Sequence, residues 1–350
     1  MTALGVARVL GAAVVSLWLG AASAPADGPV VGWGDDGSGQ ATPPPSVDGT
    51  AGLASAIAAG GTHSCAIQAG TGSVVCWGDD AWQQATPPDS VNGVAGTASA
   101  IAAGGAHSCA IQAGTGMVVC WGLDAQGQAN PPDEVNGILG TASAIAVSEI
   151  HSCAIRSTQG WVACWGDDYH GAATPPSSQL YAETLAVGSF HNCVTSGSGI
   201  VACWGDDTSG QAAAPDTVDG TLGTAAAIAA GGAHSCAIQA GTGIVVCWGL
   251  DAGGRATPPD SVNGVAGTAV AVAAGGAHSC AIQAGTDQVV CWGNDAAGQA
   301  TPPDLVNGVA GTASAIATGL NHTLAIAAPE PAVPLLAAAS GIALLVLARR

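Results

Sequence analysis

The sequence predicts an all-β fold: a seven-bladed β-propeller closed by pairing of its N- and C-terminal strands. A Trp-Gly pair recurs seven times at intervals of 44 residues, with one interval of 39, and a histidine recurs in step with it. Repeats of roughly 40–50 residues with several short strands are typical of propellers. The pairs begin at Trp33, Trp77, Trp121, Trp165, Trp204, Trp248 and Trp292.

Each unit contains three short segments that are expected to form strands, as in residues 98–102, 107–112 and 117–122. Their residues are apolar on both faces, which favours blades packed against neighbours on each side. Gly114-Thr115 fits a two-residue hairpin loop between the last two strands. The Pro-Pro and Asn-Gly pairs that follow mark a connection, which can include a short outer strand.

The two ends of the repeat region are complementary halves of one unit. Trp33 has no hairpin before it, and His322 has no Trp-Gly after it. A solenoid would require polar caps at both ends, whereas ring closure removes the exposed strand edges. Alignment places Gly32 and Leu324 at the two Cys positions of the other units. We therefore expect these two residues to be cross-strand neighbours, with Cα atoms about 4.5–5.5 Å apart, and expect a Cys pair there to form a disulfide without disturbing the fold.

The full unit reads His-Ser-Cys-Ala-Ile, a Gly turn, Val-Val-Cys-Trp-Gly and then Gly-Gln. It closely resembles the regulator-of-chromosome-condensation repeat, in the Cys-paired form found in secreted bacterial proteins that are related to β-lactamase inhibitor protein II. The match extends over all seven units, within residues 30–327. The resemblance implies a seven-bladed propeller whose loop faces bind other macromolecules. No particular activity of the family is carried over, because no exchange-factor motif is identifiable.

The charge of the chain excludes a nucleic-acid partner. The sequence has 24 acidic and five basic residues, no lysine, and a formal net charge of −19. Affinity for phosphate backbones depends on Lys and Arg, and between the terminal segments only Arg156 and Arg255 are basic. We expect a monomeric propeller that needs no cofactor.

Both terminal segments indicate export. Residues 1–24 have the features of a signal peptide: a basic start, an apolar run and a small-residue cleavage site. Residues 328–350 contain Pro329-Glu330-Pro331, an apolar run and two final arginines. This order fits a transmembrane stop-transfer segment and closely resembles the PEP-CTERM sorting signal of Gram-negative bacteria. The resemblance implies processing by an exosortase and delivery to the cell surface. The membrane is then contacted only through this segment.

Twelve cysteines fall into six pairs that lie opposite one another across the hairpins. An even number of cysteines in an exported chain indicates disulfides. The alternative is a zinc site formed by the histidine and both cysteines of a unit, but His322 persists where no cysteine is near. The pairs are Cys65/Cys76, Cys109/Cys120, Cys153/Cys164, Cys193/Cys203, Cys236/Cys247 and Cys280/Cys291.

The other recurring polar residues are interpreted as structural. The seven repeated histidines are expected to form hydrogen bonds at blade edges, and each Trp of a Trp-Gly pair is expected to pack between blades. The Asp pairs, such as Asp79-Asp80, are interpreted as turn residues that bond their own backbone, with a calcium site as the alternative. Catalysis is not expected, because a unique nucleophile would have to break the seven-fold pattern.

The pattern does break over residues 147–191, which hold the only Phe and both Tyr of the chain. Aromatic residues and arginine dominate interface energies, so this sector is the candidate binding surface; neutral drift of the least regular blades is the alternative. A second departure is Trp82, which stands where another unit has Gly127. The candidate binding residues are Arg156, Trp161, Tyr169, Tyr181, Phe190 and Trp82.

Two functions of different classes follow from these observations. The first is an exported, surface-anchored propeller that acts as a scaffold for a protein or glycan partner. The second is a structural component of the cell envelope or extracellular matrix without a discrete ligand. The near-identity of most blades favours the structural component, and the clustered aromatics favour binding. A secreted hydrolase is a remote third alternative.

Overall fold

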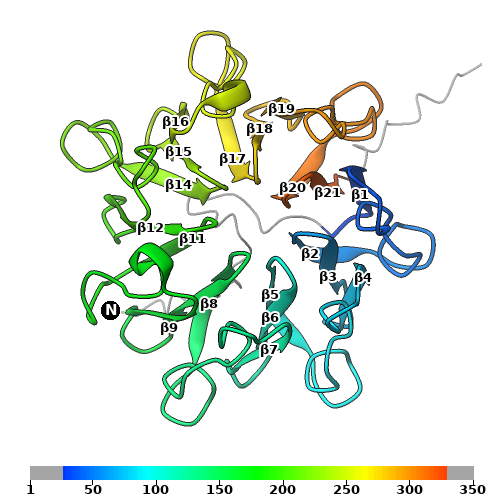
Figure 1. Ribbon diagram of the computed structural model, residues 1–350. Helices are drawn as coiled ribbons and strands as arrows, with labels where there is room; N and C mark the ends of the chain where they lie inside the picture. The colour runs from blue at the N-terminus through cyan, green and yellow to red at the C-terminus, as the bar shows by residue number, and fades with distance from the viewer. Residues whose placement is uncertain (1–26, 329–350) are drawn as a thin grey trace, which may run out of the picture.

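The computed structural model describes residues 27–328, which form seven three-stranded antiparallel sheets around a central axis (Figure 1). The expected all-β propeller with seven blades is thus confirmed. The inner strands are β2 (Ala54–Ala59), β5 (Ala98–Ala103), β8 (Ala142–Val147), β11 (Thr184–Val187), β14 (Ala225–Ala230), β17 (Ala269–Ala274) and β20 (Ala313–Thr318). The middle strands are β3 (His63–Gln68), β6 (His107–Gln112), β9 (His151–Arg156), β12 (His191–Thr195), β15 (His234–Gln239), β18 (His278–Gln283) and β21 (His322–Ala327). The outer strands are β1 (Val30–Gly34), β4 (Val74–Gly78), β7 (Val118–Gly122), β10 (Val162–Gly166), β13 (Val201–Gly205), β16 (Val245–Gly249) and β19 (Val289–Gly293).

The ring closes through its two ends, as expected. β1 pairs with β21 in antiparallel register, with Gly32 opposite Leu324. Figure 1 shows β1, in blue, beside β20 and β21, in orange and red. The closing blade is therefore built from the first and the last strands that the structure describes.

The expectation that a disulfide at this closure would leave the fold undisturbed is wrong. A Cβ atom built at Gly32 would lie 2.2 Å from the backbone oxygen of Ala41. The segment around Ala41 would have to move outward before any side chain could stand at position 32. In the disulfide's place, Leu324 is fully buried and shares an apolar cluster with Ile57 and Ala66 of the next blade.

Two local expectations are also corrected. The hairpin between β6 and β7 has four loop residues rather than two, because strand pairing ends where the Gln112 amide donates to the Met117 carbonyl at 2.8 Å. Gly114 and Gly116 both have positive φ in this loop. The connections form no fourth strand among residues 27–328. Instead, each makes a single backbone bond to the outer strand, as from the Val74 amide to the Val91 carbonyl at 3.0 Å.

Inter-blade packing is carried by small aliphatic residues and one tryptophan per blade. Trp121 of β7 belongs to the same buried cluster as Ile67 of β3 and Val74 of β4, so it packs across a blade boundary as expected. Its indole N–H donates to the Gln84 carbonyl of the preceding connection at 2.9 Å. The tryptophan therefore contributes both apolar burial and a satisfied polar group at the boundary.

The strand register defines two faces of the ring. We call turn face the one that carries the turns between inner and middle strands (residues 60–62, 104–106, 148–150, 188–190, 231–233, 275–277 and 319–321) and the loops that follow each Trp-Gly pair. The opposite face, which we call the hairpin face, carries the segments that join middle strands to outer strands and that contain the hairpin loops (residues 69–73, 113–117, 157–161, 196–200, 240–244 and 284–288). An axial cavity of about 70 Å³ lies among the turns of the turn face.

The expected signal peptide, residues 1–24, lies outside the described residues. So does the expected sorting segment, residues 328–350, apart from Ala328. Within residues 27–328, no helix has the length and apolar character needed to cross a bilayer.

Candidate binding surfaces

The repeated histidines form a ring of hydrogen bonds between neighbouring blades. His63 Nε2 lies 2.8 Å from the Ser108 hydroxyl of the next blade, and His322 Nε2 lies 2.8 Å from that of Ser64, which completes the circle. The Ser64 hydroxyl donates to the Gln40 carbonyl at 2.9 Å. The hydroxyl must therefore accept from the imidazole, so the proton of the neutral ring is on Nε2.

Burial keeps these histidines neutral. Desolvation lowers the pKa of His63 to about 4 and that of His107 to about 3, with neighbouring histidines adding to the effect. The Nδ1 atoms of His63 and His107 have no hydrogen-bond partner. A serine–histidine pair can serve as nucleophile and base, but these pairs are fully buried and repeated around the ring. Their role is structural, as the sequence indicated.

In one blade the second ring nitrogen of the histidine, Nδ1, also has a hydrogen-bond partner. Ser148 stands where six units have glycine, and its hydroxyl lies 2.8 Å from His151 Nδ1. In a glycine unit, a Cβ atom at Gly104 would lie 2.6 Å from the His107 ring and 2.3 Å from the Ser148 carbonyl oxygen. Ser148 thus gives His151 Nδ1 a partner that the histidines of the glycine units lack, at the start of the irregular sector.

All twelve cysteines form the six expected disulfides across the hairpins. Each bond joins a middle strand to the outer strand of the same blade, with Cα atoms 4.0–4.1 Å apart. Their Sγ atoms are bonded to each other and so are not free to act as zinc ligands. The disulfides favour an oxidising compartment for the folded protein. The bonded pairs are Cys65–Cys76, Cys109–Cys120, Cys153–Cys164, Cys193–Cys203, Cys236–Cys247 and Cys280–Cys291.

The two cysteines of a pair differ in burial, which corrects the expectation that every strand is packed on both faces. The six cysteines of the middle strands are fully buried. Their partners lie on the outer strands, where neighbouring blades diverge and cover less of each residue. Solvent access to a disulfide is therefore confined to its outer-strand side. The half-buried partners are Cys76, Cys120, Cys164, Cys203, Cys247 and Cys291.

Metal binding finds no support in the described part of the chain. No group of three or more His, Cys, Asp or Glu side chains suited to a metal ion is found among residues 27–328. The histidine of each unit instead bonds to the neighbouring blade, as His107 Nε2 does to the Ser152 hydroxyl at 2.9 Å. The histidines and cysteines of a unit thus serve two separate structural contacts.

The Asp pairs organise the loops after Trp-Gly. Asp36 accepts from the Ala41 amide at 2.7 Å and from the Thr42 hydroxyl at 2.6 Å. Asp35 accepts from the Gln40 side-chain amide at 2.9 Å. These contacts confirm the interpretation of the Asp pairs as turn residues, since their carboxylates bind groups of their own loop.

The irregular sector contributes an aromatic cluster to the turn face. Tyr169 begins the short 3-10 turn η1 (Tyr169–Gly171), and its ring packs edge-on against His170 and Phe190, with centroid distances of 4.0 and 5.7 Å. Phe190 lies in the turn between β11 and β12. Tyr169 is nevertheless 60% exposed. The cluster therefore presents an aromatic edge to solvent that is held in place by two other rings.

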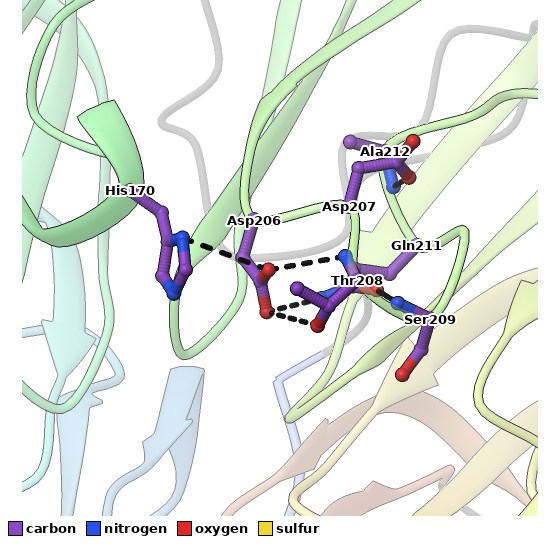
Figure 2. A network of polar contacts seen from close by, with 7 residues as sticks. All are labelled: His170, Asp206, Asp207, Thr208, Ser209, Gln211 and Ala212. Atoms are coloured by element: carbon purple, nitrogen blue, oxygen red, sulfur yellow. Dashed lines mark hydrogen bonds and ion pairs between the residues drawn. The ribbon is translucent and has the colours of Figure 1, made fainter.

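Acidic groups flank this cluster. Figure 2 shows Asp206 between His170 and Thr208: its carboxylate lies 3.8 Å from His170 Nδ1 and accepts from the Thr208 amide at 3.1 Å. Gln211 donates to it at 2.7 Å. Partial desolvation raises the pKa of Asp206, but the bonds from Thr208 and Gln211 and the nearby His170 outweigh it, so the pKa is lowered overall. Near neutral pH, Asp206 is ionised beside the aromatic cluster.

The remaining candidate residues of the sector lie on the hairpin face. The Arg156 guanidinium carbon lies 5.7 Å from the centre of the Trp161 ring. Trp161 pairs with Tyr181 through an isolated antiparallel bridge, and Tyr181 is 52% exposed. The sequence grouped five residues into one sector, but the structure divides them between opposite faces.

Trp82 lies on the turn face, in the connection after β4, and is 57% exposed. Its alignment with Gly127 is corrected by one position. Gln83 takes that place, with φ 63° where Gly127 has φ 80°. Trp82 is thus a solitary exposed ring in an otherwise regular loop.

One inter-blade contact near the aromatic cluster was not predicted from the sequence. The Ser189 hydroxyl donates to the Glu149 carboxylate at 3.0 Å, and both residues line the axial cavity. Both residues stand where the regular units have glycine, as at Gly61 and Gly105, so the sequence shows the two substitutions but not the contact between them. The position of Glu149 at the cavity follows from the ring geometry, which brings turns 40 residues apart into contact.

Comparisons with known proteins identify the fold. No protein-family model matches the chain, and no curated protein matches it. Similar solved structures include Prp20p from Saccharomyces cerevisiae (16% identity, 89% of this chain and 94% of that chain, TM-score 0.65). They also include human WBSCR16 (15% identity, 87% and 100%, TM-score 0.65) and the CRINKLY WD40 ectodomain of the Arabidopsis thaliana receptor kinase ACR4 (24% identity, 75% and 88%, TM-score 0.58).

A further match is yeast RCC1 (Prp20) from a structure of its complex with Kap60 (15% identity, 94% of this chain and 95% of that chain, TM-score 0.66). At these identities the similarity shows a shared fold. The chain thus shares the propeller fold of these proteins.

Proposed function

We propose that the protein is an exported propeller that binds a protein partner through its turn face, with Tyr169, His170 and Phe190 at the centre of the contact. The observation that carries this proposal is the exposed ring of Tyr169, which two neighbouring rings hold in one orientation. Tyrosine is enriched at interface hot spots, and a ring that is already ordered loses little conformational entropy on binding.

The carboxylates around the cluster specify the chemistry of the partner. Asp206 flanks His170, and Asp167 and Asp168 precede Tyr169 in the same loop. The chain has no lysine and a net charge of −19. A partner surface that carries arginine or lysine beside an apolar pocket is complementary to this arrangement. Raising the salt concentration should therefore slow association.

The fold supports a protein partner. Among the similar structures, Prp20p is described with its binding properties to Gsp1p and histones, and yeast RCC1 (Prp20) is bound to Kap60. Gsp1p, histones and Kap60 are partners of the yeast protein. For this chain, the similarity supports the general use of such a ring as a binding scaffold.

Export and surface attachment form the second part of the proposal. Residues 1–24 act as a signal peptide, and residues 328–350 retain or sort the protein at the cell surface. The six disulfides favour this location, because they persist in oxidising compartments. Deletion of residues 329–350 should release a folded propeller into the medium. A truncated protein that stays with the membrane would refute attachment through this segment.

A structural envelope component is the second candidate, and the regularity of the blades favours it. Five of the seven middle strands begin with His-Ser-Cys, and six blades carry the same disulfide. A purely structural role needs no particular side chain at position 169.

Affinity capture separates the two candidates. The mature propeller is cross-linked at the surface of its native cell, and the captured proteins are compared between the wild type, Tyr169→Ser and Trp82→Ser. Trp82 is the matched control, because it is nearly as exposed in the corresponding loop of another blade. A protein captured by the wild type and Trp82→Ser but not by Tyr169→Ser supports the proposal. Capture that is indifferent to Tyr169 favours the structural component.

A further inference from the structure

Arg156, on the hairpin face, is a cation without an acidic partner. No carboxylate lies within ion-pair distance of it in residues 27–328, although the chain is strongly acidic. Its Nε atom is buried and has no hydrogen-bond partner. A buried donor without an acceptor is costly. Because Nε is covered by the protein, a bound anion would contact the terminal nitrogens of the guanidinium and give its charge the partner that the chain does not supply.

One aromatic ring lies beside this guanidinium, and a second lies in the same hairpin region. Trp161 lies under the guanidinium at 5.7 Å, and the backbone of Trp161 pairs with that of Tyr181. The Tyr181 ring lies across Gly160, where a Cβ atom would come within 2.5 Å of the ring. Gly160 has φ 70°, so both its conformation and its bare Cα suit this contact. The guanidinium therefore lies over one ring, and the second ring packs on the glycine that precedes Trp161.

The other blades lack this arrangement. In four of them a glutamine stands at the position of Arg156, as Gln112 does, and its side-chain amide donates to a backbone carbonyl 22 residues earlier, for Gln112 that of Ser90 at 3.0 Å. The connection around Tyr181 also lacks the Asn-Gly or Asp-Gly pair of the other six connections. One blade thus exchanges a self-satisfied polar group for a free cation and two aromatic rings.

We infer that Arg156, Trp161 and Tyr181 form a binding site for a saccharide that carries one carboxylate, such as a glucuronic acid residue. The apolar face of a pyranose ring packs on an aromatic side chain, as other apolar surfaces do. The planar guanidinium fork matches a carboxylate with two parallel hydrogen bonds. This site lies on the face opposite Tyr169 and does not depend on the proposed protein partner.

A saccharide fits the surroundings better than an acidic peptide does. The Glu183 carboxylate and the Tyr181 ring converge on Gly197 of the next hairpin loop, within 3.5 and 3.7 Å of a Cβ atom built there. Glu183 can accept hydrogen bonds from sugar hydroxyls. An acidic peptide would bring further carboxylates against Glu183 and against a chain with net charge −19.

Calorimetric titration of the purified protein with methyl glucuronide and methyl glucoside at physiological salt tests the site. The two probes share the ring and differ in the carboxylate. We expect the glucuronide to bind at least about tenfold more tightly, as one charge-assisted hydrogen bond implies. Arg156→Gln should abolish this preference. The variant introduces the residue that four other blades carry at this position, so the fold is expected to be retained.

Arg255→Gln is the matched control. It also removes one positive charge and also restores the residue of the other blades, as at Gln211 and Gln299, but it lies on the turn face. It should leave glucuronide binding unchanged, as should Tyr169→Ser. Equal binding of the two sugars, unchanged binding by Arg156→Gln, or tighter binding of a short acidic peptide than of the glucuronide would each overturn the inference.

Discussion

Gly32 of β1 lies directly opposite Leu324 of β21, in the register that the other blades use for a pair of bonded cysteines. The closing blade therefore holds its outer strand without a covalent link. Leu324 is fully buried and fills the place of one cysteine. Because Gly32 has no side chain, the Ala41 carbonyl of the following loop can occupy the space in which a Cβ atom would lie.

We predict that Gly32→Ala destabilises the closure by about 1–3 kcal/mol, the usual cost of forcing an extra methyl group into packed surroundings. Gly37→Ala in the following loop is the control, since a Cβ atom there would meet only the Asp35 carboxylate, at 3.4 Å. The free energy of unfolding of both variants can be measured by denaturant titration. Equal stabilities would show that the Ala41 contact is not tight.

A second prediction concerns Gln128, whose buried side-chain Nε2 has no acceptor, although its Oε1 accepts from the Gln126 amide at 2.8 Å. In the neighbouring blade the equivalent Gln84 donates to Asp79 at 2.9 Å, but Leu123 stands at the corresponding position beside Gln128. Leu123→Asp should therefore raise the free energy of unfolding by about 1 kcal/mol. The gain should vanish in a Gln128→Met background, and a double-mutant cycle measures the coupling. A gain that persists in that background would assign it to another cause.

The histidine ring predicts the pH dependence of stability. Burial lowers the pKa of His191, His278 and His322 to about 4, against an ordinary value of 6.5. Between pH 6.5 and about 4 the unfolded chain binds protons that the native state does not. Stability is therefore complete above pH 6.5 and falls as the pH is lowered, by up to about 1.4 kcal/mol per pH unit for each histidine.

Self-repulsion of the acidic surface has the opposite sign, because protonation of carboxylates relieves it. Denaturant titrations at pH 7 and pH 5 decide between the two effects. We expect a lower free energy of unfolding at pH 5, with net proton uptake on unfolding. Higher stability at pH 5 would show that charge repulsion outweighs the buried ring.

The repeat period made the fold and the disulfides predictable from the sequence. Equivalent positions in successive units must occupy equivalent places in a ring, so the pairing of Cys109 with Cys120 and the closure at Gly32 followed from alignment alone. The local geometry of the loops could not be predicted from this alignment. The hairpin is centred on Gly114 and Thr115 as expected, but strand pairing ends at Gln112 and Met117, one residue earlier on each side.

The candidate surface was only partly predictable, because proximity along the chain does not specify a face. Trp161 and Phe190 belong to the same irregular stretch, yet one follows a hairpin loop and the other lies in a turn between strands. In an antiparallel blade these two kinds of loop lie at opposite ends of the strands. If each aromatic residue had been assigned either to a hairpin or to a turn between inner and middle strands, the sequence alone would have separated the two surfaces.

The dissociation constant of the captured partner for Tyr169→Ser, compared with that for Trp82→Ser, tests the central claim most directly. Truncating a hot-spot aromatic costs about 2 kcal/mol or more, which corresponds to roughly thirtyfold weaker binding. We expect such a loss for Tyr169→Ser and less than a twofold change for Trp82→Ser, with both variants folded. Equal affinities of the two variants would contradict binding through the turn-face cluster.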